Sequence, residues 1–505
     1  MDVDGDAAGR PADIEADPTS PHPSQASPHE VTLVAAAELH EKQRWQPTAL
    51  HPGPAFKTVE WSADGTAVIA STASKSILTY VLPTDLLSRD EEDDEDTGDD
   101  KASYKPMHRL LTCHGRLRFG IAPASLAPAP YFSLAAPWSQ TVLVGFRDRP
   151  IQLYPLFPPE GQDGGDDDDN VDERGIAPSK PPQPLASYSL IKHETEAYLP
   201  PMALLWPAPG NHFIVGTKSL IALFDSSRTS NDPPLLRVPT VTYTGGGFAL
   251  GLKGMVSALA AGPEGSSQHL TAAGTWTRGV GLYDLTRSGG VCAAHWKVSD
   301  DAASSVSRGD GVVQLLWSPC GRYLVVNERK SEGLLVYDVR GSGKLLCTLA
   351  GRSARSTQPI RCSVYGGNDG KENGFELWSG TDSGGIVVYE GVGQREGVVE
   401  PSWHWQAHGR TTVGGTAIHS SGSVVATCSS SLPVVDRDDD DEVEEESESE
   451  SDDDRNDDSS KSSDDSESLA SLNSTSSRGQ SRTTVSEPSL NIWSLLSLKA
   501  GSEEH

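Results

Sequence analysis

Residues 313–338 read VQLLWSPCGRYLVVNERKSEGLLVYD. Three β-rich runs alternate with turn residues in this stretch, at 313–317, 323–326 and 334–337. Pro, Ser and Gly separate the runs, which is typical of short antiparallel strands joined by tight turns. The last run ends in Tyr337-Asp338, a degenerate form of the Trp-Asp dipeptide that closes WD repeats. The stretch therefore predicts one blade of a β-propeller.

The same closing pattern, a hydrophobic run ending in Tyr, Phe or Trp, occurs seven times along the chain, at 77–80, 151–154, 221–224, 280–283, 334–337, 386–389 and 490–493. We therefore predict an all-β fold, a seven-bladed WD-repeat β-propeller. Six or eight blades stay open as alternatives, because the second blade begins in an Ala- and Pro-rich stretch. The run Val31 to Leu39 is expected to be the outer strand of the last blade, closing the ring from the N-terminal side.

Composition divides the chain into a propeller, two tails and three inserts. We expect a disordered N-terminal tail at 1–29, the propeller at 30–496 and a short C-terminal tail at 497–505. The inserts, at 88–101, 159–182 and 432–488, have the low hydrophobicity and high charge of disordered segments. They lie between strands, where a loop tolerates added length.

The formal net charge of −30 is concentrated in these inserts. Segments 90–100, 160–173 and 436–467 hold 36 of the 71 acidic residues, which leaves a body of 35 acidic and 38 basic residues. No apolar run is long enough to span a membrane, and the acidic N-terminus does not resemble a secretory signal. We expect a soluble intracellular monomer without a membrane partner, in which the cysteines are reduced.

Motifs for catalysis are missing from the sequence. It contains no GxSxG elbow, P-loop or HExxH, so we expect no enzyme activity and no cofactor. His404 and His408 have the spacing of metal ligands on a helix, but in a strand they would lie ~13 Å apart. We therefore expect no metal site.

Basic residues recur in the turns predicted between the second and third strands of five consecutive blades: Lys75, Arg147, Arg149, Lys218, Arg278, Arg329 and Lys330. In a WD propeller these turns open to one face, so the cations would form an arc that suits a phosphate backbone or a folded RNA. The alternative is ordinary surface Lys and Arg. A second basic cluster, Arg352, Arg355 and Arg361, either adds to a surface or only satisfies a loop.

The largest acidic insert carries candidate phosphorylation sites. Ser447, Ser449 and Ser451 alternate with Glu before an Asp run, which suits an acid-directed kinase, although a merely solvated tract is equally consistent with this composition. The insert would lie on the same face as the cations. It could compete there with nucleic acid, and phosphorylation would strengthen the competition.

Four of the blade sequences resemble the telomerase Cajal-body WD-repeat protein family, whose fungal relatives include a yeast pre-mRNA splicing protein. The residues that carry the resemblance are 56–65 with 77–83, 147–154, 186–194 with 203–206, and Gly274 with 278–283. The resemblance spans roughly 31–496 without the inserts. It departs from the family where Trp-Asp endings have become Tyr or Phe endings.

The resemblance implies a non-catalytic scaffold that binds small nuclear or small Cajal-body RNA and its protein components. Such a scaffold would support ribonucleoprotein assembly, trafficking or pre-mRNA splicing in the nucleus, with the cytoplasm as a second location. Other proteins would dock on the propeller faces. The alternative is a general protein-interaction propeller, such as a ubiquitin-ligase substrate adaptor, since fold alone does not assign function.

Overall fold

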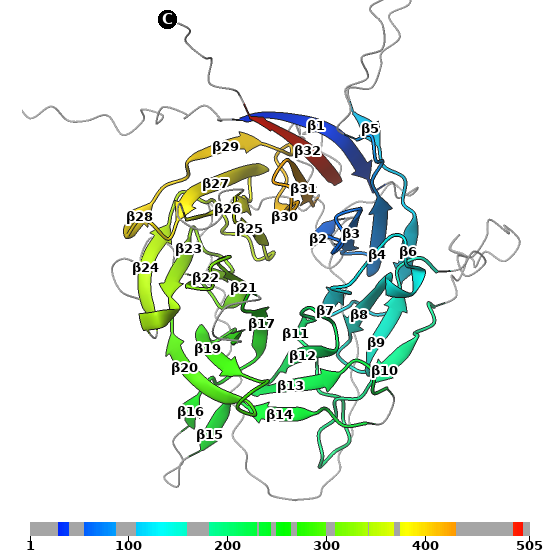
Figure 1. The fold of residues 1–505 in the computed structure, drawn as a ribbon, viewed down its shortest axis with the longest axis vertical. Coiled ribbons are helices and arrows are strands. Elements are labelled where there is room, and N and C mark those ends of the chain that lie inside the picture. Colours follow the sequence, from blue (N-terminus) through cyan, green and yellow to red (C-terminus); the bar gives the residue numbers. More distant parts are fainter. Residues whose placement is uncertain are drawn as a thin grey trace, which may run out of the picture. The chain divides into compact units, whose positions relative to one another are not determined.

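A computed structural model describes residues 29–39, 55–86, 108–158, 181–229, 232–243, 249–263, 270–298, 309–341, 343–367, 374–430 and 488–497. Seven antiparallel sheets stand around a central channel, which confirms the predicted seven-bladed propeller (Figure 1). Helical structure in these residues is limited to two short 3-10 turns, η1 (Pro137–Ser139) and η3 (Val339–Gly341). No helix among the described residues is long and apolar enough to cross a membrane.

Each blade places its first strand, strand a, at the channel and continues outward through strands b, c and d (Figure 1). Blades 1 to 4 contain, in this order, β2 (Phe56–Trp61), β3 (Ala67–Thr72), β4 (Ser76–Val81) and β6 (Gly115–Arg118); β7 (Ser125–Pro128), β8 (Thr141–Gly145), β9 (Ile151–Pro155) and β10 (Ala186–Tyr188); β11 (Ala203–Leu205), β12 (His212–Thr217), β13 (Leu220–Asp225) and β14 (Leu236–Pro239); β17 (Val256–Ala261), β18 (Thr271–Thr275), β19 (Gly279–Asp284) and β20 (Val291–Lys297). Blades 5 to 7 contain β21 (Val312–Trp317), β22 (Tyr323–Glu328), β23 (Leu334–Asp338) and β24 (Lys344–Leu349); β25 (Cys362–Tyr365), β26 (Phe375–Gly380), β27 (Gly385–Val392) and β29 (Trp403–Gln406); β30 (Val413–Ile418), β31 (Val424–Ser429), β32 (Ser489–Ser497) and β1 (His29–Glu38).

The ring closes where the N-terminal strand joins the C-terminal one. β1 runs antiparallel to β32 from His29 opposite Ser497 to Glu38 opposite Ser489, with one bulge between Leu33 and Ala35. This pairing confirms the prediction that the run Val31 to Leu39 forms the outer strand of the last blade, although β1 begins at His29 and ends at Glu38. Closure by two ends of the chain leaves no open edge inside the ring.

Three further elements extend the blades. β5 (Arg109–Leu110) pairs in parallel with β1, and β28 (Gly397–Val399) pairs in parallel with β24. Each therefore adds a fifth strand to the outer edge of the neighbouring blade. A hairpin of β15 (Val241–Tyr243) and β16 (Ala249–Gly251) lies in the connection from blade 3 to blade 4.

Glycine at the end of strand b lets neighbouring blades approach closely. A Cβ on Gly216 would lie 2.6 Å from Val256, and a Cβ on Gly274 would lie 2.5 Å from Val312. Gly380 meets Val413 of blade 7 in the same way, at 2.6 Å. In each pair the valine begins or precedes strand a of the next blade, so the absent side chain sets the spacing between two sheets.

One hydrogen-bonded network ties blade 6 to blade 7. The buried His408 ring contacts the Thr427 hydroxyl at 2.8 Å through Nε2 and the Ser489 hydroxyl at 3.0 Å through Nδ1. Trp493 Nε1 donates to the same Thr427 oxygen at 2.9 Å. Burial lowers the pKa of His408 to about 3, so its ring is neutral at ordinary pH.

Candidate nucleic-acid interface

All seven predicted cations lie in turns between strands b and c of blades 1 to 5. We call the surface formed by Lys75, Arg147, Arg149, Lys218, Arg278, Arg329 and Lys330 the cationic face. Connections from strand d to the next blade reach the same face, because they bond to these turns. Phe119 N donates to Lys75 O at 3.1 Å, and Val298 N donates to Arg278 O at 2.8 Å.

The local backbone of these turns follows a shared sequence pattern. Thr72 and Thr275 end strand b, and each hydroxyl accepts a hydrogen bond from the backbone N–H four residues later, at 3.2 and 2.9 Å. The residue before that N–H is Lys75 or Arg278, with φ of 65° and 62°. This left-handed conformation turns the chain sharply and leaves both side chains at the end of the blade.

Two acidic residues neutralise part of the cationic face. Arg278 makes two hydrogen bonds to Glu328, from Nε at 2.7 Å and from Nη2 at 3.2 Å, and its side chain is only 14% exposed. Arg329 and Lys330 share Asp310, at 2.9 and 3.7 Å. The sequence pattern missed both acids, because Asp310 lies in the connection to blade 5 and Glu328 replaces a turn threonine at the end of β22.

The other four cations have weaker ties to the protein. Lys75 donates to the Gly120 carbonyl at 3.1 Å, and Arg149 contacts Asp148 at 3.4 Å while its guanidinium lies 5.2 Å from the Phe146 ring centroid. Arg147 and Lys218 are exposed. These four residues on blades 1 to 3 therefore form the part of the arc that is least neutralised by acidic residues among the described residues.

Trp276 is a feature of the cationic face that the sequence analysis did not identify. It lies in the turn from β18 to β19, two residues before Arg278, and 41% of its surface is exposed. The Arg329 guanidinium lies 6.0 Å from its ring centroid. An exposed aromatic ring between cations can stack a nucleobase while the cations contact phosphate. The signal for it is the presence of Trp in a turn where small polar residues are usual.

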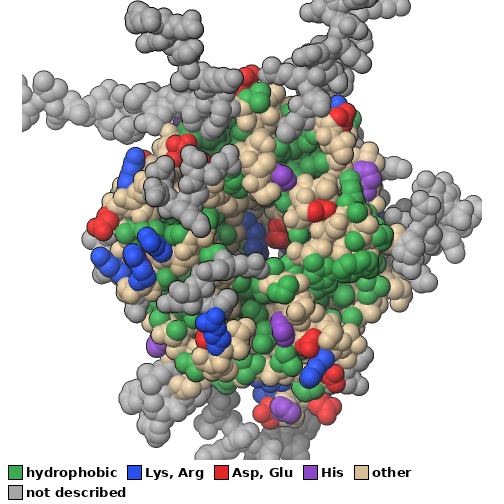
Figure 2. All heavy atoms as spheres, viewed as in Figure 1, with side chains coloured by type: hydrophobic (Ala, Val, Ile, Leu, Met, Phe, Trp, Pro, Cys, Tyr) green, Lys and Arg blue, Asp and Glu red, His purple; other side chains and the backbone are tan. Residues whose placement is uncertain are grey.

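Cations also occupy the opposite face, formed by the turns between strands a and b and between strands c and d. Arg228, Arg287 and Arg340 lie in turns from strand c to strand d, and Lys344 begins strand d of blade 5. Figure 2 shows Lys and Arg side chains gathered over β23 and β24. Arg340 is paired with Asp338 at 2.6 Å, which holds the pKa of that carboxyl below its usual value. Basic residues are therefore not confined to the cationic face.

The second basic cluster divides among three environments. Arg352 is buried between blades 5 and 6, where its Nη1 donates to Asn327 at 3.1 Å and to Ser379 at 3.3 Å. Arg355 pairs with Glu332 at 2.5 Å on the surface. Arg361 lines the central channel. The cluster therefore does not extend the cationic face as a group.

The candidate phosphorylation sites Ser447, Ser449 and Ser451 lie outside the described residues, as do most of the three acidic inserts. His404 is exposed on β29, whereas His408 is buried in the blade 6–7 network. Among the described residues no group of His, Cys, Asp and Glu is arranged to hold a metal ion.

Comparison with known proteins confirms the predicted resemblance to telomerase Cajal-body WD-repeat proteins. The chain is 24% identical to telomerase Cajal body protein 1 of Bos taurus over 388 residues, which are 76% of this chain and 59% of that protein. It is 23% identical to the Homo sapiens protein of the same name over 386 residues, 76% of this chain and 58% of that protein. No protein-family model matches the chain.

A relative with a different name shows similar identity. Guanine nucleotide-binding protein negative regulator 1 of Schizosaccharomyces pombe is 24% identical over 309 residues, 60% of this chain and 64% of that protein. The chain thus spans 58% to 64% of the length of these three relatives.

Proposed function

We propose that this relative of telomerase Cajal body protein 1 is a non-catalytic WD-repeat scaffold that binds small nuclear RNA and its protein components. Its role would be the nuclear assembly or trafficking of ribonucleoproteins, including those of pre-mRNA splicing. Relatives named for the Cajal body support the nuclear part of this proposal. The observation that carries the RNA part is the placement of a cation in the b–c turn of each of five consecutive blades.

The charge distribution favours RNA contact on blades 1 to 3 and base stacking on blade 4. Among the residues that the structure describes, no buried carboxylate binds Lys75, Arg147, Arg149 or Lys218, so a phosphate can approach them at little cost. Arg278 already has a desolvated partner in Glu328 and serves chiefly to hold its turn. Trp276 offers a ring to an unpaired base beside Arg329.

Ultraviolet crosslinking of the full chain in its own cells, followed by sequencing of the bound RNA, tests this function. We expect enrichment of small nuclear or small Cajal-body RNAs. Crosslinking should fall when Lys75, Arg147, Arg149 and Lys218 are replaced by Glu, and also in Trp276→Ala. A matched control replaces Arg228, Arg287, Arg340 and Lys344 on the opposite face by Glu and should retain the RNA.

Two results would count against the proposal. Equal loss of RNA in the control variant would show that the position of the charge is irrelevant. Absence of crosslinked RNA, with protein partners retained, would favour the general protein-interaction propeller.

A further inference from the structure

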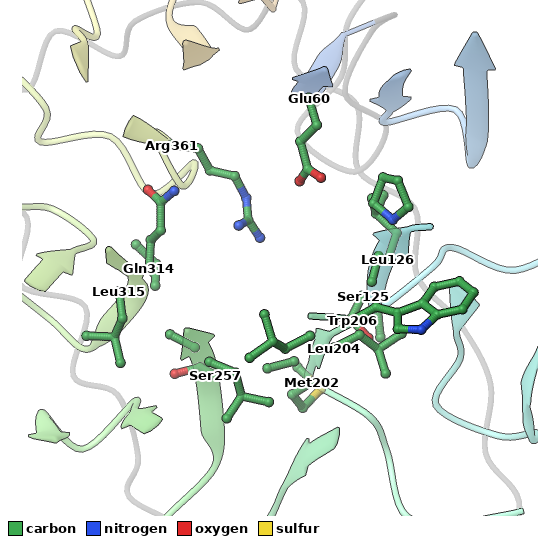
Figure 3. Close-up of a pocket in the computed structure, with 18 residues that line it drawn as sticks. Glu60, Ser125, Leu126, Met202, Leu204, Trp206, Ser257, Gln314, Leu315 and Arg361 are labelled. Carbon is green, nitrogen blue, oxygen red and sulfur yellow. The ribbon is translucent and has the colours of Figure 1, made fainter. Parts of the chain in front are cut away.

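The channel of the propeller contains a cavity of about 280 Å3. Its wall is formed by strands a of blades 1 to 5 and by the entry to blade 6 (Figure 3). Aliphatic side chains, among them Leu126, Met202 and Leu204, line the cavity along blades 2 and 3. Glu60 and Arg361 occupy the other side, and their charged ends point into the cavity and toward each other. Figure 2 shows an acidic and a basic side chain facing each other within the channel.

Other polar side chains of the wall are occupied by bonds within the protein. Ser125 donates to Pro201 O at 2.6 Å, and Ser257 donates to Val312 O at 2.6 Å. Gln314 is held by both of its amide atoms: it accepts from Cys362 N at 2.8 Å and donates to Cys362 O at 2.9 Å. None of these three side chains needs a ligand.

Glu60 and Arg361 differ from those side chains. Among the described residues, neither side chain has a hydrogen-bond or ion-pair partner, and the two act on each other only through Coulomb attraction. Desolvation raises the pKa of Glu60, and Arg361 offsets this in part. Half-buried charged groups without partners are costly, so a cavity that keeps two of them is suited to a polar ligand.

Backbone hydrogen bonds fix Glu60 and Arg361 on the two sides of β30, the strand of blade 7 that contains Gly414 and Gly415. Glu60 lies in β2 opposite Ile69. Arg361 N donates to Gly414 O at 3.0 Å, and Thr416 N donates to Arg361 O at 3.2 Å. Gly414 and Gly415 of blade 7 lie between them in the ring and carry no side chain that could reach either charge. The site is therefore held open by rigid strands.

We propose that the channel binds a side-chain carboxamide, from an Asn or Gln that a partner protein inserts as part of a peptide loop. The carboxamide oxygen would accept from the Arg361 guanidinium, and the amide nitrogen would donate to the Glu60 carboxyl group. The aliphatic wall would cover the methylene stem. A carboxylate ligand would face Glu60 and an ammonium ligand would face Arg361, so a neutral group with both a donor and an acceptor complements the pair.

The wall favours a peptide over a nucleobase. An isolated base is usually held between aromatic rings or guanidinium planes. The aromatic residue in this wall is Trp206, which is 6% exposed and donates its Nε1 to Gly210 O at 2.8 Å. The site therefore goes beyond the proposed RNA function and does not depend on it.

A library of random 12-residue peptides displayed on phage, selected on the full chain, provides the probe. We expect enriched peptides to share an Asn or Gln, and a synthetic copy to lose at least tenfold in affinity when that residue becomes Ala. Glu60→Gln and Arg361→Gln should each weaken the peptide by a similar factor. Ser257→Ala is the matched control in the same wall and should leave the affinity unchanged.

A change in which peptide each variant binds best would distinguish direct recognition of the amide from a general loss of stability. Glu60→Gln should favour a peptide in which the amide residue is replaced by Glu, and Arg361→Gln should favour one with Lys at that place. Selected peptides without a shared amide, or peptides indifferent to both variants, would overturn the proposal. Binding of a mixed-sequence RNA 12-mer that Arg361→Gln abolishes would also overturn it, by assigning the channel to nucleic acid.

Discussion

The sequence pattern predicts where the basic residues of the turns lie, but it does not predict which acidic residues pair with them. The positions of Lys75, Arg278 and Lys330 in b–c turns follow from the strand spacing, and the structure places them there. Their partners do not follow. Glu328 follows the predicted run 323–326 and looks like one more polar turn residue, yet it is the buried acid that binds Arg278 of the preceding blade. Pairing between blades depends on three-dimensional register, which a sequence repeat does not encode.

Replacement of Glu328 by Ala should lower the free energy of unfolding by about 3 kcal/mol, because Arg278 then keeps a half-buried charge without its partner. Urea unfolding measures the change. In blades 1, 3, 4 and 6 a threonine ends the corresponding strand or follows it, and blade 6 has glycine at the place of Arg278. The double variant Arg278→Gly with Glu328→Thr should therefore recover most of the loss. A double variant as unstable as Glu328→Ala would contradict this account of the pair.

His408 should make stability depend on pH. The pKa of His408 is about 3 in the folded protein, below the ordinary value of 6.5. Between these two pH values the ring is protonated in the unfolded chain and neutral in the folded chain. The contribution of neutral His408 to the free energy of unfolding is therefore fully present above pH 6.5, and it is lost as the pH falls toward 3. At pH 5 the loss from this group is about 2 kcal/mol.

The variant His408→Gln tests this assignment, because an amide can bond to Thr427 but does not titrate near pH 5. Urea midpoints at pH 7.5 and pH 5 should differ less in the variant than in the natural chain, by an amount equivalent to about 2 kcal/mol. An unchanged pH dependence would show that another group is responsible.

At the scale of the element, the strands were the most predictable feature. The runs at 77–80, 323–326 and 334–337 all fall within strands, because these short apolar runs are buried almost throughout and are bounded by turn residues. The extra strands β5 and β28 were not predicted. Each is two or three residues long, and it is a strand only because the neighbouring blade offers an edge.

Packing between blades should be sensitive to the glycine at the end of strand b. Gly274→Ala places a Cβ 2.5 Å from Val312 Cγ1, and the overlap should cost about 1 to 3 kcal/mol. Gly120→Ala is the matched control, since nothing lies within 4 Å of its Cβ position. Val312→Ala in the Gly274→Ala background should recover part of the loss. Equal stability of the two glycine variants would refute the packing argument.

For the molecule as a whole, the sequence predicted the ring and its closure but not its channel. The closing strand β1 follows from a hydrophobic run without a hairpin partner of its own. The opposed pair Glu60 and Arg361 does not follow, because the two residues are 301 positions apart and meet only when blades 1 and 6 take their places around the axis.

Deletion of residues 1–38 removes β1 and should open the ring. β32 would lose its partner along nine paired positions, so we expect a lower thermal midpoint and concentration-dependent association through the exposed edge. Deletion of residues 1–28 leaves β1 intact and serves as the control. Scanning calorimetry and light scattering measure the two effects. A ring that melts normally without β1 would contradict closure by the two termini.

The most direct test of RNA binding by the cationic face is the salt dependence of affinity for a folded small nuclear RNA. One variant replaces Lys75, Arg147, Arg149 and Lys218 by Gln, and the matched control makes the same change at Arg228, Arg287, Arg340 and Lys344 on the opposite face. The account predicts a salt slope that is lower by roughly 3 for the first variant, at about 0.7 to 0.9 per lost phosphate contact, and an unchanged slope for the control. Equal slopes for both variants and the natural chain would contradict it.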